Sequence, residues 1–176
     1  VLNDKLVDRK AIKEAGFKVV LDAVNSIGGP TMPLLLNELG VECVKLNCEA
    51  TGDFAHNPEP LPQNLTALSE TVVKERADLG ISVDPDVDRL ALICENGEPF
   101  GEEYTLVSVA DYVLSNNNGG NTVSNLSSSR ALRDITEKWG GRYSAAAVGE
   151  VNVTTKMREV SAVIGGEGNG GVIYPG

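Results

Sequence analysis

The sequence LGISVDPDVDRLALIC, residues 79–94, places an acidic loop between two short apolar runs. Residues 79–83 and 90–94 have the length and apolar content of β-strands, and the loop between them carries three aspartates at two-residue spacing. In an open α/β sheet, ligands bind just beyond the carboxyl ends of the strands, which is where this loop begins. The stretch therefore predicts two neighbouring strands and a site at one end of them.

The three aspartates of this loop are Asp84, Asp86 and Asp88. Alternate residues of an extended segment point the same way, so the three carboxylates can converge. Converged carboxylates repel each other without a cation, and an all-oxygen ligand set favours Mg²⁺ over a transition metal. Arg89 adds a planar fork of donors suited to a phosphate beside the metal. The spacing thus favours a magnesium site that meets a phosphate.

Three alternatives for the acidic loop are open at this point: a solvated turn, a calcium-binding EF-hand and a phosphatase with a nucleophilic aspartate. An EF-hand would place the aspartates and Glu95 at loop positions 1, 3, 5 and 12, but Arg89 stands where position 6 needs glycine. The phosphatase would also need a downstream lysine and a second acidic cluster, and no such cluster is evident.

Strand and helix patterns alternate on the N-terminal side of the loop, as expected for an α/β domain. Glycine and three prolines in residues 51–62 indicate a loop, in which the only histidine, His56, is expected at a turn or on the surface. The other elements predicted here are a strand over 18–24, a helix over 33–39 capped by Thr31, a strand over 41–46, and a helix from its cap Asn64 to about Arg76.

A second round of the same alternation follows residue 100 and forms a weak internal repeat. Ser127, Ser128 or Ser129 is expected to cap its second helix. The sequence therefore predicts two small three-layer α/β/α domains, 1–100 and 101–176, with mixed, mostly parallel sheets. The predicted elements are helices over 103–114, 130–139 and 152–159, and strands over 122–126, 142–147, 162–164 and 172–174.

A glycine-rich loop, GGEGNGG at residues 165–171, follows one of these strands. Its spacing matches the GxGxxG of dinucleotide sites, but a β-branched and aromatic stretch follows where a helix should hold the pyrophosphate. The glycines would let the backbone approach a polar ligand, with Glu167 and Asn169 projecting groups that suit sugar hydroxyls. A flexible hairpin loop without a ligand is the alternative.

The composition excludes several classes of function. Fifteen Lys and Arg against 25 Asp and Glu give a net charge of −10, which argues against binding a nucleic-acid backbone. The longest purely apolar run, residues 90–94, is too short to span a membrane. Three cysteines without a CxxC pair indicate reduced thiols and a cytoplasmic protein, and one histidine makes a zinc site improbable. The first residue, Val1, and the lack of room for a closing helix favour a truncated chain.

Three segments together resemble the α-D-phosphohexomutases, the phosphoglucomutase, phosphomannomutase and phosphoglucosamine mutase enzymes. DPDVDRL at 84–90 resembles the family's Mg²⁺ loop, usually written DGDGDR or DPDGDR. GEGNGG at 166–171 resembles the sugar-specificity loop, commonly GEMSGH or GEQSGH, and NPEP at 57–60 is a third similar segment. The resemblance runs from about Lys18 to Pro175 and covers the second and most of the third of the family's four domains.

The resemblance implies roles for particular residues. Gly171 stands where the family commonly has histidine, and Asn169 where serine is common, so these two positions depart from its pattern. The implied Mg²⁺ ligands are Asp84, Asp86 and Asp88, the implied catalytic groups are Arg89 and Lys156, and the implied hydroxyl-binding groups are Glu167 and Asn169.

The reaction implied by the resemblance is the interconversion of hexose 1-phosphate and hexose 6-phosphate through a phosphoserine and a bisphosphate. The phosphoserine would lie in a TASHNP-like motif of the first domain, and a phosphate clamp in the fourth. Residues 55–58 echo the end of that motif, but no serine precedes them, so the chain alone is expected to be inactive. The implied partners are the hexose phosphate and those two domains. The alternative is a metal-binding regulatory or interaction module without its own catalysis.

Overall fold

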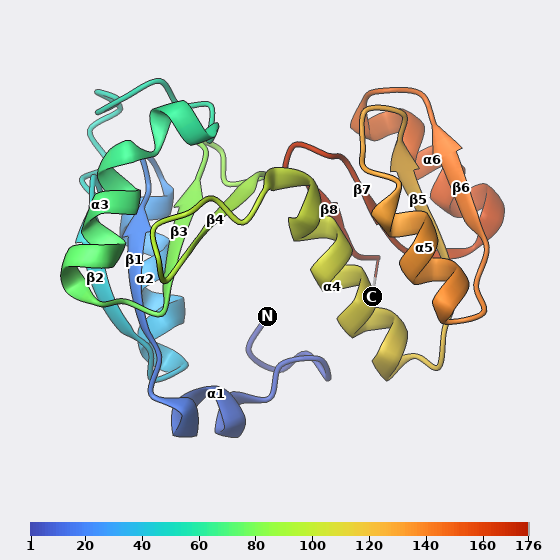
Figure 1. The fold of residues 1–176 in the computed structure, drawn as a ribbon, viewed down its shortest axis with the longest axis horizontal. Helices are drawn as coiled ribbons and strands as arrows, with labels where there is room; N and C mark the ends of the chain where they lie inside the picture. Colours follow the sequence, from blue (N-terminus) through green and yellow to red (C-terminus); the bar gives the residue numbers. More distant parts are fainter. Residues whose placement is uncertain (176) are drawn as a thin grey trace. The chain divides into compact units, whose positions relative to one another are not determined.

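The computed structural model describes residues 1–175. They form two compact units, one over residues 1–100 and one that begins at Gly101 (Figure 1). Each unit contains its own four-stranded sheet and its own helices, and each is described separately.

The first unit is built on a mixed sheet in the order β2-β1-β3-β4. Its strand β1 runs parallel to both β2 and β3, and β4 returns antiparallel to β3. This confirms the predicted mixed, mostly parallel sheet. The elements are α1 (Arg9–Ala15), β1 (Lys18–Asp22), α2 (Gly28–Glu38), β2 (Glu42–Leu46), the 3₁₀ turn η1 (Pro62–Asn64), α3 (Thr66–Glu75), β3 (Leu79–Val83) and β4 (Leu90–Cys94).

Helices cover both faces of this sheet because successive residues of its strands point to opposite sides. Val20 of β1 packs with Leu68 and Val72 of α3 in one buried cluster. Its neighbours Val19 and Leu21 pack instead with Leu36 of α2 on the other face. The result is the predicted three-layer arrangement, with the carboxyl ends of β1 and β3 at one edge.

The start of α2 differs from the prediction. The helix begins at Gly28, and Thr31 lies inside it, where its hydroxyl donates to the Ile27 carbonyl oxygen at 2.8 Å. Gly28, Gly29 and Pro30 precede the predicted cap but belong to the helix, and Pro30 falls in the first helical turn, where a backbone N–H has no partner in any case. Gly29 packs against the Cys48 carbonyl so closely that a Cβ there would overlap it.

Two further differences concern the ends of helices. Asn64 is not the cap of α3, because it closes the 3₁₀ turn and its side-chain amide donates to the Glu59 carbonyl oxygen at 2.8 Å. Helix α1 was not predicted at all. Its cap is Asp8, whose carboxylate accepts from the Ala11 backbone N–H at 2.9 Å.

The second unit repeats the topology of the first in the order β6-β5-β7-β8. Strand β5 is parallel to β6 and β7, and β8 is antiparallel to β7. In both sheets the second strand is at the edge, followed by the first, third and fourth, which confirms the internal repeat. The elements are α4 (Glu102–Asn116), β5 (Asn121–Asn125), α5 (Ala131–Lys138), β6 (Tyr143–Ala146), α6 (Glu150–Val160), β7 (Ala162–Gly166) and β8 (Val172–Ile173).

The helices of the second unit also lie on both faces of its sheet. On one face Val123 of β5 packs with Val153 and Met157 of α6. On the other, the hydroxyl of Thr122 in β5 pairs with that of Thr136 in α5 at 2.6 Å, and α4 packs beside α5. No helix in the described part of the chain is long and apolar enough to span a membrane.

Two boundaries in the second unit differ from the sequence prediction in ways that matter for the site. Strand β7 continues to Gly166, so the sheet extends into the glycine loop. Helix α6 begins at Glu150, two residues before the predicted start, directly after Gly149. Of the three candidate capping serines, only Ser129 accepts a helical N–H, from Ala131 at 3.1 Å. The other two hydroxyls bond to Asn125 instead.

Acid sensitivity of the second unit is expected from a pair that joins α4 to the end of α5. The indole N–H of Trp139, the only tryptophan, donates to the Asp111 carboxylate at 2.6 Å. This hydrogen bond, with a further contribution from Lys138, holds the pKa of Asp111 below its ordinary value of 3.8. A carboxyl whose pKa is depressed by folding stabilises the fold above its unfolded pKa and loses that contribution as pH falls through the folded pKa.

We therefore expect the free energy of unfolding to decrease as the pH is lowered below about 4. This decrease should be smaller in Asp111→Asn. Trp139 fluorescence during urea unfolding at a series of pH values measures the effect. An equal loss of unfolding free energy at low pH in the wild type and in Asp111→Asn would contradict this role of Asp111.

Candidate functional site

The acidic loop of the first unit turns sharply after β3 and brings its three carboxylates together. One oxygen from each of Asp84, Asp86 and Asp88 lies within 4.8 Å of the others. The Val87 N–H donates to the Asp84 carbonyl oxygen at 3.1 Å, and Val87 adopts a left-handed conformation with φ of +64°. A β-branched residue rarely adopts this conformation, which fits the glycine that the resembled motif has at this position.

Asp84 is the buried member of the cluster and also organises the loop. One carboxylate oxygen accepts from the backbone N–H groups of Asp88 and Arg89 at 3.1 and 3.0 Å, and the other accepts from the Arg89 Nε–H at 2.8 Å. Burial acts to raise the pKa of Asp84, but these hydrogen bonds and the Arg89 charge outweigh it and hold the pKa below its usual value. The carboxylate is therefore kept ionised although it has no exposed surface.

The other two carboxylates of the cluster are exposed and concentrate negative charge. Burial and the neighbouring carboxylates of Asp84 and Asp86 raise the pKa of Asp88 above its usual value. A divalent cation would relieve this repulsion, and the oxygen-only donor set is the kind that Mg²⁺ prefers. Within the described residues, this is the one group of three or more acidic, histidine or cysteine side chains close enough to share a metal.

Arg89 is held in a fixed orientation by two carboxylates from different segments. Its Nη1 donates to Glu59 at 2.6 Å, while its Nε donates to Asp84. The hydrogen bond with Glu59 is the main cause that raises the pKa of Arg89. Glu59 had no predicted role, and the only sequence signal for it is its position in the NPEP segment. The two bonds leave Nη2 as the group available to a phosphate.

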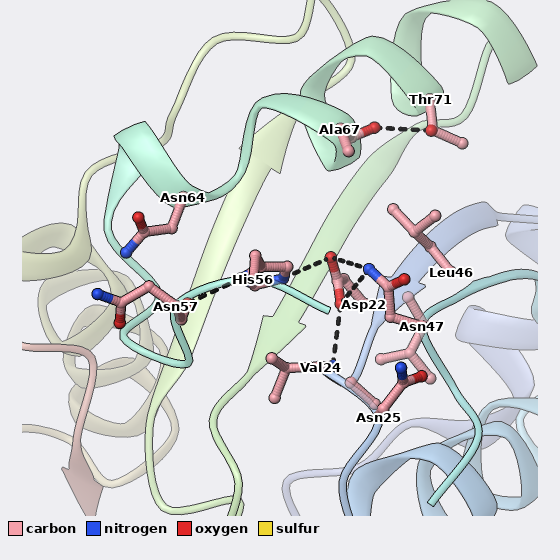
Figure 2. A network of polar contacts seen from close by, with 12 residues as sticks. Asp22, Val24, Asn25, Leu46, Asn47, His56, Asn57, Asn64, Ala67 and Thr71 are labelled. Carbon is pink, nitrogen blue, oxygen red and sulfur yellow. Dashed lines mark hydrogen bonds and ion pairs between the residues drawn. The ribbon is translucent and has the colours of Figure 1, made fainter. Parts of the chain in front are cut away.

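The loop that carries Glu59 is anchored to the end of β1 by a buried polar network (Figure 2). Asp22, with 1% of its surface exposed, accepts from the Val24 N–H at 2.9 Å and from the Asn47 side-chain amide at 3.1 and 3.2 Å. His56 lies with Nε2 at 3.1 Å from the Asp22 carboxylate and Nδ1 at 2.8 Å from the Asn57 carbonyl oxygen. His56 lies at a bend of the loop, as expected, and its half-buried ring also anchors the loop to the end of β1.

In the second unit, the carboxyl ends of three strands meet at Glu167. Its Oε1 accepts from the Asn125 side-chain amide at 2.7 Å and from the Gly149 N–H at 3.0 Å. Asn169 is exposed, and its side-chain oxygen accepts from the Gly171 N–H at 3.1 Å within the loop. The two predicted hydroxyl-binding residues are thus on one loop, and Glu167 is the more firmly fixed.

Two glycines of this loop pack closely against the chain's own backbone. A Cβ at Gly168 would lie 2.9 Å from the Ser127 carbonyl oxygen, and a Cβ at Gly166 would overlap the Gly171 carbonyl. Gly166 and Gly168 therefore permit this internal packing.

Lys156 lies on α6 and pairs with Glu159 one turn away, with Nζ 2.9 Å from the carboxylate. Its side chain is 38% exposed. Such an exposed pair between neighbouring helix turns contributes only a few tenths of a kcal/mol, so the lysine can leave it for another anion. Within the described residues, no hydrogen bond or ion pair joins Lys156 to Glu167.

Comparison with known proteins agrees with this architecture. Residues 2–97 match the family described as phosphoglucomutase/phosphomannomutase, alpha/beta/alpha domain II, and residues 101–176 match alpha/beta/alpha domain III of the same family. The chain therefore belongs to the phosphoglucomutase/phosphomannomutase family, as the motifs had indicated.

Individual relatives support the same assignment. A phosphoglucomutase/phosphomannomutase of Thermococcus kodakarensis is 41% identical over 170 residues, which are 96% of this chain and 37% of that protein. A phosphomannomutase/phosphoglucomutase of Pseudomonas aeruginosa is 33% identical over 160 residues, 90% of this chain and 35% of that protein. The chain thus spans little more than a third of these relatives.

Solved structures show the same fold. A phosphoglucomutase/phosphomannomutase family protein from Burkholderia thailandensis superposes with a TM-score of 0.84 at 31% identity, covering 90% of this chain and 35% of that one. An N-acetylphosphoglucosamine mutase from Aspergillus fumigatus, solved with GlcNAc-6P and magnesium, has a TM-score of 0.62 at 16% identity, covering 94% and 36%. At that identity the second likeness concerns the fold alone.

Proposed function

We propose that this chain forms the metal-binding and sugar-binding middle domains of a phosphohexomutase that interconverts hexose 1-phosphate and hexose 6-phosphate. The observation that carries the proposal is the converged Asp84, Asp86 and Asp88 cluster beyond a parallel strand, in a chain whose family is the phosphoglucomutases and phosphomannomutases. The first and fourth domains of the family, with the phosphoserine and the phosphate clamp, are its proposed partners.

The three aspartates would hold Mg²⁺, which when bound offsets negative charge on a phosphoryl group during its transfer. Asp84 would act from a buried, fixed position, while the exposed Asp86 and Asp88 would adjust to the ion. Arg89 would present its Nη2 to a phosphate oxygen, and its bonds to Asp84 and Glu59 prevent it from swinging away. This pre-organisation is the main protein contribution available to phosphoryl transfer.

Glu167 and Asn169 would bind hexose hydroxyls, and Lys156 would contact the substrate. A carboxylate accepts hydrogen bonds from hydroxyls and orients a sugar ring without holding its phosphate. The loop could therefore serve both orientations of the sugar that a 1-to-6 transfer requires. The Aspergillus fumigatus structure, which shares the fold, was solved with GlcNAc-6P and magnesium.

A cytoplasmic location is part of the same proposal. The three cysteines of the chain are all free thiols. Burial raises the pKa of the Cys43 and Cys48 thiols, so both are poorly reactive side chains that suit a reducing compartment.

Mg²⁺ binding by the chain itself tests the metal assignment. We expect Mg²⁺ to shift the amide signals of residues 84–89 first in a nuclear magnetic resonance titration. Asp86→Ala should weaken binding at least about tenfold, because it removes one of three carboxylates from the ion. Calorimetry on the same proteins gives the affinities.

Glu95→Ala is the matched control, because Glu95 is an exposed carboxylate of the same unit outside the cluster. It should leave Mg²⁺ affinity unchanged. A calcium site of the EF-hand type would instead lose Ca²⁺ binding in Glu95→Ala. Unchanged Mg²⁺ affinity in Asp86→Ala would show that the acidic loop is not the site.

A further inference from the structure

Asn125 occupies a position that no sequence motif singled out. It is the last residue of β5, and only 2% of its surface is exposed. Its side chain lies between the turn that follows its own strand and Glu167, which is 42 residues further along the chain. Asn125 is thus a buried asparagine at the edge of the sheet where ligands bind in open α/β folds, and it is bonded to a candidate ligand-binding carboxylate.

The direction of the Asn125 hydrogen bonds is fixed by its neighbours. Its amide oxygen accepts from the hydroxyls of Ser127 and Ser128 at 3.1 and 2.7 Å. Its amide nitrogen therefore faces Glu167, at 2.7 Å from Oε1. Because an ionised carboxylate only accepts hydrogen bonds, this orientation satisfies both ends of the amide, and the flipped orientation would place the amide oxygen against the carboxylate oxygen.

A second donor completes the arrangement around Glu167. The Gly149 N–H, at the start of α6, also donates to Oε1, at 3.0 Å. The two donors come from the ends of β5 and of the β6–α6 connection, so the carboxylate is held from two sides. Both bonds are charge-assisted and place the carboxylate plane in one orientation. Oε1 is thus occupied by the protein, and Oε2 is the oxygen left for a ligand.

We propose that Asn125 is a positioning residue for sugar recognition: it acts through Glu167 by holding Oε1, so that Oε2 alone meets a hexose hydroxyl. This inference rests on the proposed role of Glu167 in hexose binding. It makes recognition depend on a single, rigidly aimed acceptor, so a displacement of that oxygen weakens its hydrogen bond to the sugar.

The test uses the full-length mutase that carries this chain, with glucose, mannose and glucosamine phosphates as substrates. We expect Asn125→Ala to lower kcat/KM by about ten- to a hundredfold, the cost of one hydrogen bond to a charged group. Glu167→Ala should lower it at least as much. The double variant should be no worse than Glu167→Ala alone, because Asn125 acts only through Glu167.

Asn121→Ala is the matched control, because Asn121 is the same residue type at the opposite end of the same strand. Its amide donates to the Val160 carbonyl oxygen at 2.8 Å, so its loss costs a structural hydrogen bond away from Glu167. This variant should keep the wild-type kcat/KM and the wild-type preference among the three substrates. A merely structural role of Asn125 would make Asn125→Ala resemble Asn121→Ala.

The outcomes separate the inference from the function on which it rests. If Glu167→Ala keeps full activity on all three substrates, the hexose-binding role itself is wrong. If Glu167→Ala is impaired but Asn125→Ala is not, or if their effects multiply in the double variant, the positioning role is overturned.

A spectroscopic measurement on the 176-residue chain keeps the inference testable should Asn125→Ala not fold. The Asn125 side-chain amide protons should exchange slowly, and their signals should move in Glu167→Ala. Fast exchange, or signals that do not respond, would overturn the inference.

Discussion

Asp84→Ala should lower the free energy of unfolding of the first unit by about 2–4 kcal/mol and remove Mg²⁺ binding in the same step. Asp84 has no exposed surface and accepts three hydrogen bonds, two from backbone N–H groups and one from the Arg89 side chain. Without its carboxylate, the two N–H groups lose their acceptor and the guanidinium loses one of its two carboxylate partners. The turn that brings Asp86 and Asp88 together would then lose the hydrogen bonds that hold it.

Asp86→Ala provides the contrast, because Asp86 is exposed and belongs to the same cluster. In Mg²⁺-free buffer its stability should stay within about 0.5 kcal/mol of the wild type, and removing one like charge could only help. Urea unfolding of both variants, followed by circular dichroism with and without Mg²⁺, separates the two roles. Equal stability of Asp84→Ala and Asp86→Ala would contradict a structural role for Asp84.

The grouping of the three aspartates could be predicted from the sequence because all three are local. Asp84, Asp86 and Asp88 lie within five residues directly after an apolar strand, although a sharp turn at Val87, and not the predicted extended alternation, brings their carboxylates together. The flanking strands β3 and β4 have the predicted bounds for the same reason. The left-handed conformation of Val87 could not be predicted from this residue, because a β-branched side chain opposes it.

The contacts that hold the candidate residues in place were not predictable, because they join distant segments. Arg89 is bonded to Glu59, 30 residues away, and His56 to Asp22, 34 residues away. The two donors to Glu167 are likewise 42 and 18 residues distant. The pairing of Asn125 with Glu167 follows from the strand order, which places the ends of β5 and β7 side by side. The other three pairings involve residues that follow the second strand of each sheet, namely His56 and Glu59 after β2 and Gly149 after β6. Sequence periodicity fixes which residues end the strands, but not which side chains meet there.

The start of α2 shows how packing overrides a local turn signal. Gly-Gly-Pro at 28–30 has the composition of a loop, yet the backbone of Gly29 is in close contact with the Cys48 carbonyl. Gly28 likewise lies close to the side chains of Val83 and Ala23, so the two glycines let the first helical turn pack against several segments at once. Their function is steric fit, which composition alone does not distinguish from flexibility.

The second prediction with a large expected effect concerns mutase turnover by the 176-residue chain alone. The 176-residue chain, incubated with glucose 1-phosphate, Mg²⁺ and a hexose bisphosphate, should form no glucose 6-phosphate. Phosphoryl transfer of this type needs a nucleophile that accepts the phosphoryl group, and the segment at 55–58 that echoes the family's phosphoserine motif contains no serine. In the proposed function, the carboxylates of the chain hold the metal and its arginine stabilises the transferring group, so neither serves as the phosphoryl acceptor.

In the proposed full-length mutase, Asp86→Ala should lower kcat by about a hundred- to ten-thousandfold, because a bound metal would contribute several kcal/mol to the stabilisation of transition-state charge. Glu95→Ala should not change it. A coupled assay for glucose 6-phosphate measures both enzymes and the isolated chain. Turnover that grows in proportion to the concentration of the purified chain would show that this chain holds its own phosphoryl acceptor.

Full activity of Asp86→Ala at limiting Mg²⁺ would show that the catalytic metal lies elsewhere. A chain that binds Mg²⁺ while the full-length protein shows no mutase turnover would favour a metal-binding module without catalysis.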